Sequence, residues 1–374
     1  MPGVKRVGII STYPPTCCGL ATFSAALADG LRGNGVDVDV VRIADGSPTD
    51  HTAVVGELVT GSPASTAECS ALLNACDVAV IQHEYGIYGG RDGEDVVDLI
   101  GGLRVPSIVV AHTILKNPTP HQRSVLEAIA TMADHVVVMT TAASDRLVGG
   151  YSVDRRKVST IAHGVHVGAG THVKRSGRPI LLTWGLLGPG KGIERVIDVM
   201  ASLRDLPGCP HYIVAGLTHP KVLAAEGEAY REALLARAID GGVADCVQFD
   251  RSYRDAHSLS ALVQSASVVV LPYDSTEQVT SGVLVDAIAN GRPVVATKFP
   301  HAIELLRDGT GIVVDQDDSV ALAAALRRVL TDPCLAGTMS AKARSIAPTM
   351  AWSMVAAEYL AVANQLCAKR SAAL

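Results

Sequence analysis

Aromatic residues are scarce in this chain: Phe, Trp and Tyr together make up only 4% of its 374 residues. Proteins that bind single-stranded nucleic acids stack the bases on aromatic side chains, so this composition argues against such a partner. The charge balance points the same way, because a formal net charge of −5 lacks the basic excess that binds phosphate backbones. We therefore expect no nucleic-acid partner.

The eight cysteines lack the two-residue spacing of zinc and dithiol redox motifs. Most of them follow or precede apolar residues, so we expect buried, reduced thiols. Long apolar runs are also missing. No stretch approaches the ~20 residues that span a bilayer, and the N-terminal apolar run, within MPGVKRVGIISTY, is too short for a signal peptide. These features predict a cytoplasmic protein without a transmembrane segment.

Apolar residues, by contrast, make up 48% of the chain, and only 18% of its residues are charged. This composition is typical of parallel sheets that are covered on both faces. Strand and helix signals alternate along two stretches, residues 1–168 and 178–352, which predicts two doubly wound α/β domains. A polar, Gly-rich linker is expected between Val167 and Arg178, and residues 353–374 have the pattern of an amphipathic helix.

Residues 271–297 have the order strand, loop, helix, strand. The helix start would leave the backbone amides of Thr280, Ser281 and Gly282 unpaired, and such helix ends bind phosphate or sugar oxygens. Asp286 lies just inside this helix, where its carboxylate can accept hydrogen bonds from ribose or sugar hydroxyls. The pattern suggests a nucleotide-sugar site. The alternative is an ordinary strand–helix–strand unit with a solvated Asp286.

This segment resembles the donor-binding signature of the retaining glycosyltransferases of family 4, the group 1 glycosyltransferases. That signature has two glutamates eight positions apart, then an Ala-rich helical turn, a Gly and a Pro-Val-Val strand. Here Asp286 takes the second acidic position and Gln278 the first, with Glu277 one residue before it. The resemblance implies that Asp286 binds the ribose and that Gln278 and Glu277 bind hydroxyls of the donor sugar.

The same resemblance implies a GT-B fold, in which two Rossmann-like domains with doubly wound parallel sheets face a central cleft. Residues 1–168 would then form the acceptor-side domain, with the helix 353–374 packing back on it. Residues 178–352 would form the domain that binds the nucleotide-sugar donor.

A second motif, TWGLLGPGKGI at residues 183–193, has a strand, a Gly-rich turn and a helix start. Lys191 is placed to meet a phosphate held at that helix start. The spacing from Gly185 to Gly190 and Lys191 nearly matches the P-loop of ATPases. That motif needs Ser or Thr at the next position to hold Mg²⁺, and Gly192 stands there instead. A P-loop ATPase is therefore the weaker alternative.

The group 1 pattern at this place is Gly-Arg-Leu, a short gap, then Lys-Gly. Gly185, Lys191 and Gly192 match it, whereas Leu186 replaces the arginine. In the family, the Arg and the Lys together hold the donor diphosphate. The resemblance therefore implies that Lys191 acts alone with the helix dipole, or that another cation such as Arg251 takes the place of the missing arginine.

Two further groups of candidates lie in the first half of the chain. The loop STYPPTCCGLATF leads from the first strand into a helix near Gly19, whose backbone allows close approach of a ligand. The alternative is a plain strand-to-helix turn. The resemblance implies that Gly19 lies near the donor phosphate and the acceptor, because family members have a Gly-rich loop here.

The second group consists of polar residues at predicted strand ends, where open α/β sheets place their ligands: His83, Glu84 and His112. A His-Glu-His metal site is conceivable, but the helical spacing that would support it is missing. His112 matches a family histidine near the donor sugar, so the resemblance implies that it acts in catalysis together with Lys191. It also implies that His83, Glu84 and Tyr85 contact the acceptor, and that neither a metal nor another cofactor is needed.

The lesser candidates also follow strands. Gly216 resembles the family Gly after a strand of the second domain, and Arg251 lies where family members meet the nucleobase. His163, Gly164 and Val165 resemble a structural turn that precedes the linker.

The predicted function is that of a retaining glycosyltransferase. It would move a hexosyl unit from a nucleoside-diphosphate sugar to a hydroxyl group of a glycan, lipid or small-metabolite acceptor, in carbohydrate biosynthesis. Two alternatives stay open on the same fold: an epimerase or phosphorylase, and a non-catalytic protein that binds sugar nucleotides or glycans. Replacement of the family Arg by Leu186 and of the family Glu by Gln278 is the observation that keeps the non-catalytic alternative open.

Overall fold

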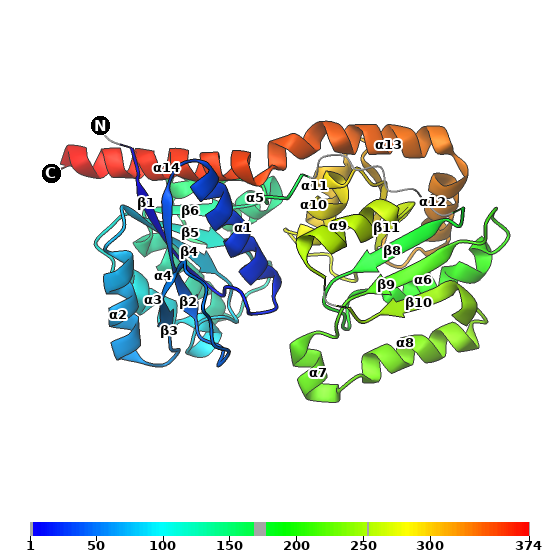
Figure 1. Ribbon diagram of the computed structural model, residues 1–374, viewed down its shortest axis with the longest axis horizontal. Coiled ribbons are helices and arrows are strands. Elements are labelled where there is room, and N and C mark those ends of the chain that lie inside the picture. The colour runs from blue at the N-terminus through cyan, green and yellow to red at the C-terminus, as the bar shows by residue number, and fades with distance from the viewer. Residues whose placement is uncertain (1–2, 168–176, 253, 374) are drawn as a thin grey trace. The chain divides into compact units, whose positions relative to one another are not determined.

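The chain divides into two compact units in the computed structural model, which describes residues 3–167, 177–252 and 254–373. Unit 1 comprises Met1–Gly164 with Thr349–Leu374, and unit 2 comprises Val165–Pro348 (Figure 1). Most of the linker predicted between Val167 and Arg178 lies outside the described residues.

Unit 1 contains a seven-stranded parallel sheet with the strand order β3-β2-β1-β4-β5-β6-β7. The sequence order reverses between the neighbours β1 and β4, as in doubly wound folds. Its strands are β1 (Arg6–Ser11), β2 (Asp37–Ile43), β3 (Val54–Leu58), β4 (Val78–His83), β5 (Ser107–Ala111), β6 (His135–Val138) and β7 (Val158–Thr160). All residues of β4 and β5 are buried, as expected for central strands that helices cover on both faces.

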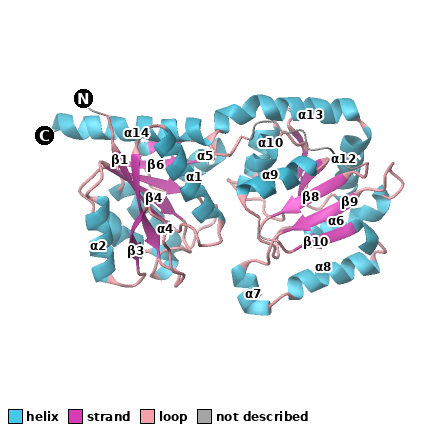
Figure 2. Cartoon of the chain, in the orientation of Figure 1, coloured by secondary structure: helices cyan, strands magenta, loops and turns pink. Residues whose placement is uncertain are grey.

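Helices flank this sheet (Figure 2). They are α1 (Gly19–Gly33), α2 (Pro63–Leu73), α3 (Asp95–Gly101), α4 (Pro120–Met132), α5 (Thr141–Gly150) and α14 (Trp352–Ala373). The C-terminal helix α14 packs closely on α1, because a Cβ atom on Gly30 would lie 2.7 Å from the carbonyl oxygen of Trp352. Trp352, Val355 and Tyr359 form its buried face.

Unit 2 repeats the doubly wound plan with a six-stranded parallel sheet in the order β10-β9-β8-β11-β12-β13. Its strands are β8 (Ile180–Trp184), β9 (His211–Ala215), β10 (Val247–Asp250), β11 (Val268–Leu271), β12 (Val294–Thr297) and β13 (Gly311–Val314). Its helices are α6 (Ile193–Met200), α7 (Pro220–Glu226), α8 (Ala229–Asp240), α9 (Ala256–Ser265), α10 (Gly282–Ala289), α11 (Pro300–Leu306), α12 (Ser319–Thr331) and α13 (Pro333–Ile346).

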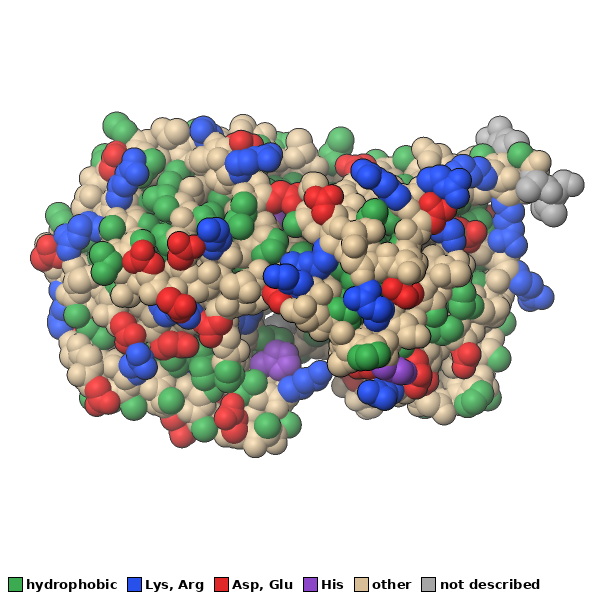
Figure 3. Space-filling model, turned by 180° about the vertical axis from the view of Figure 1, so that it is seen from behind, with side chains coloured by type: hydrophobic (Ala, Val, Ile, Leu, Met, Phe, Trp, Pro, Cys, Tyr) green, Lys and Arg blue, Asp and Glu red, His purple; other side chains and the backbone are tan. Residues whose placement is uncertain are grey.

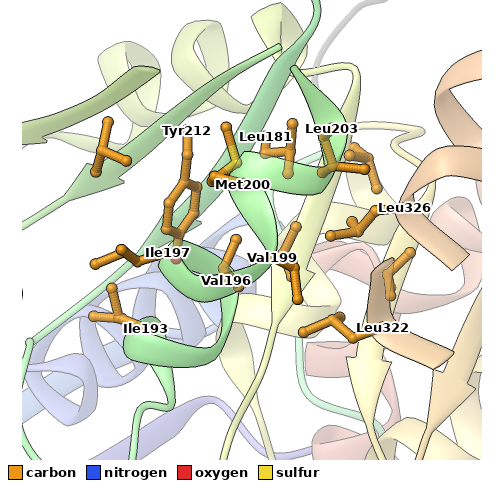
Figure 4. Close-up of a cluster of buried hydrophobic side chains, with 14 of the residues drawn as sticks. Leu181, Ile193, Val196, Ile197, Val199, Met200, Leu203, Tyr212, Leu322 and Leu326 are labelled. Atoms are coloured by element: carbon orange, nitrogen blue, oxygen red, sulfur yellow. The ribbon is translucent and has the colours of Figure 1, made fainter. Parts of the chain in front are cut away.

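The core of unit 2 lies between α6, α12 and the sheet. Figure 4 shows Ile193, Ile197 and Met200 of α6 close to Tyr212 of β9, with Leu326 of α12 in the same cluster, and all five side chains are buried. The apolar positions of α6 recur every three or four residues and so form one face of the helix. This face fixes the helix against β8 and β9 and thereby positions the Gly-rich turn that precedes it.

The sequence pattern did not reveal one strand, β3, and this changes the environment of its neighbour. The alternation of residues 36–43 with a period of two predicts a more exposed strand, yet β2 is buried from Val40 onward. In the structure β3 pairs with β2 and places Glu57 beside Arg42. The guanidinium of Arg42 is fully buried and lies 2.5 Å from the Glu57 carboxylate. A buried charge of this kind needs a partner, which the missed strand supplies.

The apolar periodicity of residues 178–352 also does not reveal three helices of unit 2: α7, α11 and α13. Each begins with a proline in its first turn. Proline at this position is a helix-start signal, because its missing amide proton would have no partner within the helix anyway. That signal was present in the sequence at Pro220, Pro300 and Pro333.

The cysteines differ from the expectation as well. Cys69, Cys76 and Cys246 are buried, Cys17 and Cys334 are exposed, and the other three lie between these extremes. The prediction that most of them are buried is therefore wrong. Runs of apolar neighbours in the sequence do not reveal on which side of a turn a short side chain will lie.

The surface mixes charges of both signs. On the face seen in Figure 3, Lys and Arg side chains lie interspersed with Asp and Glu side chains, in keeping with the modest net charge of −5. Among the residues that the structure describes, no helix combines the length and the apolar character needed to cross a membrane.

Candidate functional site

The loops that follow β8 and β11 meet at the point in unit 2 where the strand order reverses. These two strands are neighbours, and their connections run to opposite sides, which opens a crevice at the carboxyl ends of the strands. A cavity of about 580 Å³ lies there. Its lining consists of Pro189, Gly190, Lys191, Tyr273, Asp274, Ser275, Thr276, Glu277 and Gln278. Four predicted donor-side residues are thus brought together: Gly190, Lys191, Glu277 and Gln278.

The other predicted donor-side residues do not line this cavity. Gly185 and Gly216, which follow β8 and β9, lie against each other, since a Cβ atom on Gly216 would be 2.0 Å from the carbonyl oxygen of Gly185. Arg251 is exposed and follows β10, at the edge of the sheet, whereas Lys191 follows the central strand β8. That Arg251 stands in for the arginine that Leu186 replaces stays a prediction.

Glycines let the loop after β8 fold tightly against the loop after β11. Gly192 has a φ of +64° and directly precedes α6. A Cβ atom at this position would lie 1.7 Å from the carbonyl oxygen of Pro272, so only glycine fits. The amide of Asp274 also donates to the carbonyl oxygen of Gly190 over 3.0 Å. The two loops therefore form one packed wall of the cavity.

Lys191 is the cation of this cavity. Its Nζ atom lies 4.6 Å from the centre of the Tyr273 ring, a cation–π contact. Within the described part of the chain, no carboxylate lies within ion-pair distance of it. Burial lowers the pKa of the Lys191 ammonium, because desolvation penalises the charged form. An anion entering the cavity would supply the missing counter-charge.

A second cation, Arg195 on α6, braces the wall from outside the cavity. Its guanidinium forms ion pairs with Asp274 and, at 3.3 Å, with Asp317. It also donates to the carbonyl oxygen of Pro272 over 3.3 Å. Arg195 was not among the residues predicted from the sequence, although its place one turn into the helix after a Gly-rich motif was a usable signal.

The start of α10 differs from the prediction in one respect. The Ser281 amide is not available to a ligand, because it donates to Nδ1 of the buried His301 over 2.8 Å. The Ser281 hydroxyl caps the helix by accepting from the Leu284 amide. The amides of Thr280 and Gly282 have no hydrogen-bond partner among the described residues. The Ser281 amide was predicted to bind phosphate or sugar oxygens. That prediction is wrong, because His301, which lies 20 positions later in the chain, accepts the hydrogen bond of this amide.

Gln278 and Asp286 carry the two signature positions. The Gln278 side-chain amide donates to the Thr280 carbonyl over 2.9 Å, which turns the side chain into the loop. Asp286 lies in α10 and is half-buried, and its carboxylate has no hydrogen-bond partner among the residues that the structure describes. Burial raises the pKa of Asp286 from 3.8 to about 7.

This pKa predicts how stability depends on pH. Between pH 4 and pH 7 the folded state keeps a proton on Asp286 that the unfolded chain has released, so stability falls as the pH rises through this window. Relative to an Asp286→Asn variant, wild type should lose roughly 4 kcal/mol of unfolding free energy across it. Urea unfolding of both proteins from about pH 4 to about pH 8 measures this difference. If the difference in unfolding free energy between the two proteins does not change with pH, the ionised Asp286 carboxylate is solvated in the folded state.

In unit 1 the predicted histidines gather at the ends of β4 and β5. The Nε2 atom of His112 lies 2.6 Å from Oε1 of Gln82, and the imidazole packs edge-on against Phe23. Because an amide oxygen only accepts, Nε2 carries the proton and Nδ1 keeps a lone pair. Burial, with a smaller contribution from His163 and His83, lowers the pKa of His112 to about 3. His112 is therefore neutral at physiological pH and suited to hydrogen bonding.

His83 cannot touch a ligand directly, because its side chain is 0% exposed. Neither ring nitrogen of His83 has a partner in the described residues, and burial lowers the pKa of this group to about 4. Direct contact between His83 and an acceptor is thus excluded in this structure. The end of a central strand was correctly located, but every residue of β4 is buried, His83 included, because helices cover both faces of the sheet.

Glu84 and Tyr85 are held by neighbours. The Glu84 carboxylate accepts a 2.5 Å hydrogen bond from the Thr113 hydroxyl and a 3.1 Å bond from the Tyr85 amide. The Tyr85 hydroxyl donates to the Gln122 carbonyl over 3.4 Å, and the ring contacts that of His83. Both side chains are half-buried and so keep some access to solvent.

The loop that leads to Gly19 is held by Arg42. The guanidinium donates to the Tyr13 carbonyl over 3.2 Å and to the Thr16 hydroxyl over 3.0 Å. Gly19 begins α1, and a Cβ atom there would meet nothing within 4 Å, so its backbone is open to approach. Cys18 caps the helix, with its sulfur accepting from the Ala21 amide. The hydrogen bonds from Arg42 to this loop could not be predicted from the sequence, because Arg42 lies far from the loop in the chain.

Among the described residues, no three His, Cys, Asp or Glu side chains are grouped so that they could hold a metal ion. The His-Glu-His combination that the strand ends made conceivable does not form such a group, because Glu84 is engaged with Thr113 and His83 is enclosed.

The comparisons with known proteins agree with this geometry. Residues 178–332 match the family described as glycosyl transferases group 1. Anabaena HepE, solved in complex with UDP, superposes with a TM-score of 0.75 at 18% identity over 99% of this chain and all of its own. This likeness shows the fold.

Two curated relatives are named D-inositol 3-phosphate glycosyltransferase. The protein of Corynebacterium diphtheriae is 26% identical over 90% of this chain and 87% of its own length. That of Salinispora arenicola is 26% identical over 71% of this chain, and the match spans 64% of the relative.

The chain therefore has the GT-B fold, and residues 178–332, within unit 2, match the group 1 glycosyltransferases. The resemblance and the fold class predicted from the sequence are both confirmed.

Proposed function

We propose that this chain is a retaining glycosyltransferase that moves a hexosyl unit from a nucleoside-diphosphate sugar to an acceptor hydroxyl. The observation that carries the proposal is the Lys191 ammonium, which faces a cavity at the sheet reversal without a carboxylate partner among the described residues. Glu277 and Gln278 line the same cavity and can bind sugar hydroxyls. HepE, with the same fold, has been solved with UDP and with UDP-glucose, so a uridine donor is the first choice.

In the proposed reaction the bond between the anomeric carbon and the diphosphate breaks, and the acceptor oxygen bonds to the same face of that carbon. The acceptor proton passes to the leaving phosphate oxygen. Lys191 and the amides of Thr280 and Gly282 stabilise the charge that develops on the diphosphate, which lowers the barrier. Asp286 binds the ribose. The neutral His112 binds the sugar by a hydrogen bond, and no metal ion takes part.

Unit 1 is proposed to bind the acceptor, with Gly19, Glu84 and Tyr85 as its contacts. The names of the relatives make a phosphorylated cyclic polyol, D-inositol 3-phosphate, the first acceptor to test. Glycan and lipid acceptors are tested next, in the same transfer reaction.

Calorimetry in the presence of EDTA tests the donor site directly. UDP, GDP, ADP and dTDP are titrated first and the matching sugar nucleotides next. We expect micromolar binding of one nucleotide, unaffected by the chelator, and a comparable affinity for its sugar conjugate. If no nucleotide binds at millimolar concentration, the proposed donor site is wrong. If binding appears only with added Mg²⁺, the metal-independent mechanism is wrong.

A second candidate is a non-catalytic protein that binds sugar nucleotides. Leu186 and Gln278, which replace charged family residues, favour it. Turnover distinguishes the two candidates. Tight binding of the donor without release of nucleoside diphosphate, over a broad panel of acceptors, would show that the chain is a non-catalytic binding protein.

A further inference from the structure

Two cysteines that are distant in the sequence meet at the amino-terminal ends of β9 and β10. Cys209 lies two residues before β9, and Cys246 directly precedes β10. The strands are neighbours in the sheet, with Val247 paired to Tyr212. As a result the two sulfur atoms lie 3.7 Å apart, although 37 positions separate the residues in the chain.

The surroundings of this pair favour thiol chemistry. The guanidinium of Arg178 lies 3.9 Å from the Cys209 sulfur and 3.7 Å from the Cys246 sulfur. It also donates to the Cys209 carbonyl over 2.6 Å. A fixed cation beside two thiols stabilises the thiolate, which is the nucleophile in disulfide exchange.

The two thiols differ in access. Cys209 is half-buried, whereas Cys246 is fully buried. Because the Cys246 side chain is enclosed, the Cys209 sulfur is the one that meets a reagent first. Cys209 also has a φ of +46°, which is uncommon for a residue with a side chain. Such backbone positions persist where the surrounding structure holds them, often at reactive sites.

We propose that Cys209 and Cys246 form a reversible disulfide with small-molecule disulfides such as oxidised glutathione. The Cys209 thiolate attacks one glutathione sulfur, so that a mixed disulfide forms and one reduced glutathione leaves. The Cys246 thiolate then attacks the Cys209 sulfur and releases the second glutathione. In total, two protein thiols are oxidised to one disulfide, one glutathione disulfide is reduced to two thiols, and both protein protons pass to the released glutathiones.

This bond would close a segment that contains β9, α7 and α8. A cross-link over 37 positions restricts the unfolded chain and should stabilise unit 2. Gly216 and Arg251 follow the opposite, carboxyl ends of the same strands. The disulfide would therefore brace the two strands from the end away from the proposed donor site, without occupying that site.

The experiment uses the full chain, equilibrated in buffers with a series of reduced-to-oxidised glutathione ratios. Free thiols are then blocked with iodoacetamide and the digested protein is mapped by mass spectrometry. We expect a peptide pair cross-linked through Cys209 and Cys246, lighter by two hydrogens, which disappears with dithiothreitol. The exposed Cys17 and Cys334 serve as internal controls, because they should carry only iodoacetamide or single glutathione adducts.

Thermal unfolding provides a second readout. Oxidised wild type should unfold a few degrees above the reduced protein, and Cys209→Ser should show no such shift. The proposal is overturned if both cysteines stay alkylated at every ratio, or if Cys209 keeps its glutathione because Cys246 does not displace it. The mass-spectrometric mapping needs wild type only, so its outcome decides the proposal even if the Ser variant folds poorly.

Discussion

Replacing Lys191 with Ala should weaken binding of the donor nucleotide by roughly 100-fold, which corresponds to a loss of about 3 kcal/mol. The Lys191 ammonium lines the cavity at the sheet reversal and has no carboxylate partner among the described residues. A diphosphate would form charge-assisted hydrogen bonds with it in a partly desolvated place, where such bonds are strong. Calorimetry with UDP and with a UDP-sugar measures the change in dissociation constant.

Three variants sharpen this test. Lys191→Arg keeps the charge and should lose far less affinity than Lys191→Ala. Tyr273→Phe should bind nearly as well as wild type, because the ammonium lies over the ring and not beside the hydroxyl. Lys342→Ala is the matched control. It removes a lysine of the same unit whose ammonium is bonded to the Asp308 carbonyl.

The transfer reaction extends the test to catalysis. If Lys191→Ala leaves both nucleotide affinity and transfer rate within a few-fold of wild type, the site is wrongly assigned. If affinity is kept and only the rate falls, Lys191 acts mainly on the leaving group in the transition state.

Replacing Gly192 with Ala should cost about 2–5 kcal/mol of stability and displace the loops that form the cavity wall. Two effects add. The left-handed φ of +64° is unfavourable for alanine, and the new Cβ atom would lie 1.7 Å from the Pro272 carbonyl oxygen. Because Pro272 begins the loop that carries Tyr273, Glu277 and Gln278, any relief of the collision moves the residues that line the cavity.

Gly242→Ala separates the two effects. Gly242 has nearly the same φ, +65°, but a Cβ atom there would meet nothing within 4 Å. This variant should therefore show only the conformational cost, about 1–2 kcal/mol, and normal nucleotide binding. Denaturant unfolding and calorimetry of both variants provide the comparison. Equal losses of stability would mean that the two loops are not in contact at Pro272.

Several parts of the site could be predicted because they depend on local pattern. The strand, loop and helix order of residues 271–297 placed Gln278 and Asp286 without knowledge of the fold. The Gly-rich motif did the same for Lys191, and apolar runs located most strands. The comparisons then confirmed the fold and the resemblance of residues 178–332 to the group 1 glycosyltransferases. Local signals suffice here because backbone conformation and hydrophobic period act over a few residues.

Other features depended on partners that are remote in the chain. The side chain of His301 accepts a hydrogen bond from the Ser281 amide. Glu57 forms an ion pair with Arg42, and Arg195 forms one with Asp274. In each case the chemistry of one residue was visible, but its partner was not. The enclosure of His83 belongs to the same class, because burial is decided by the helices that cover the sheet.

The sequence by itself thus determined the alternation of strands and helices, the glycines at tight turns and the identity of the cation and acids near one strand end. Only the tertiary structure decided which groups are already paired, which are buried and which thiols meet. The physical reason is that hydrogen bonds, ion pairs and desolvation act over a few ångströms in space. The parallel sheet brings residues such as Cys209 and Cys246 within that range across 37 positions of sequence.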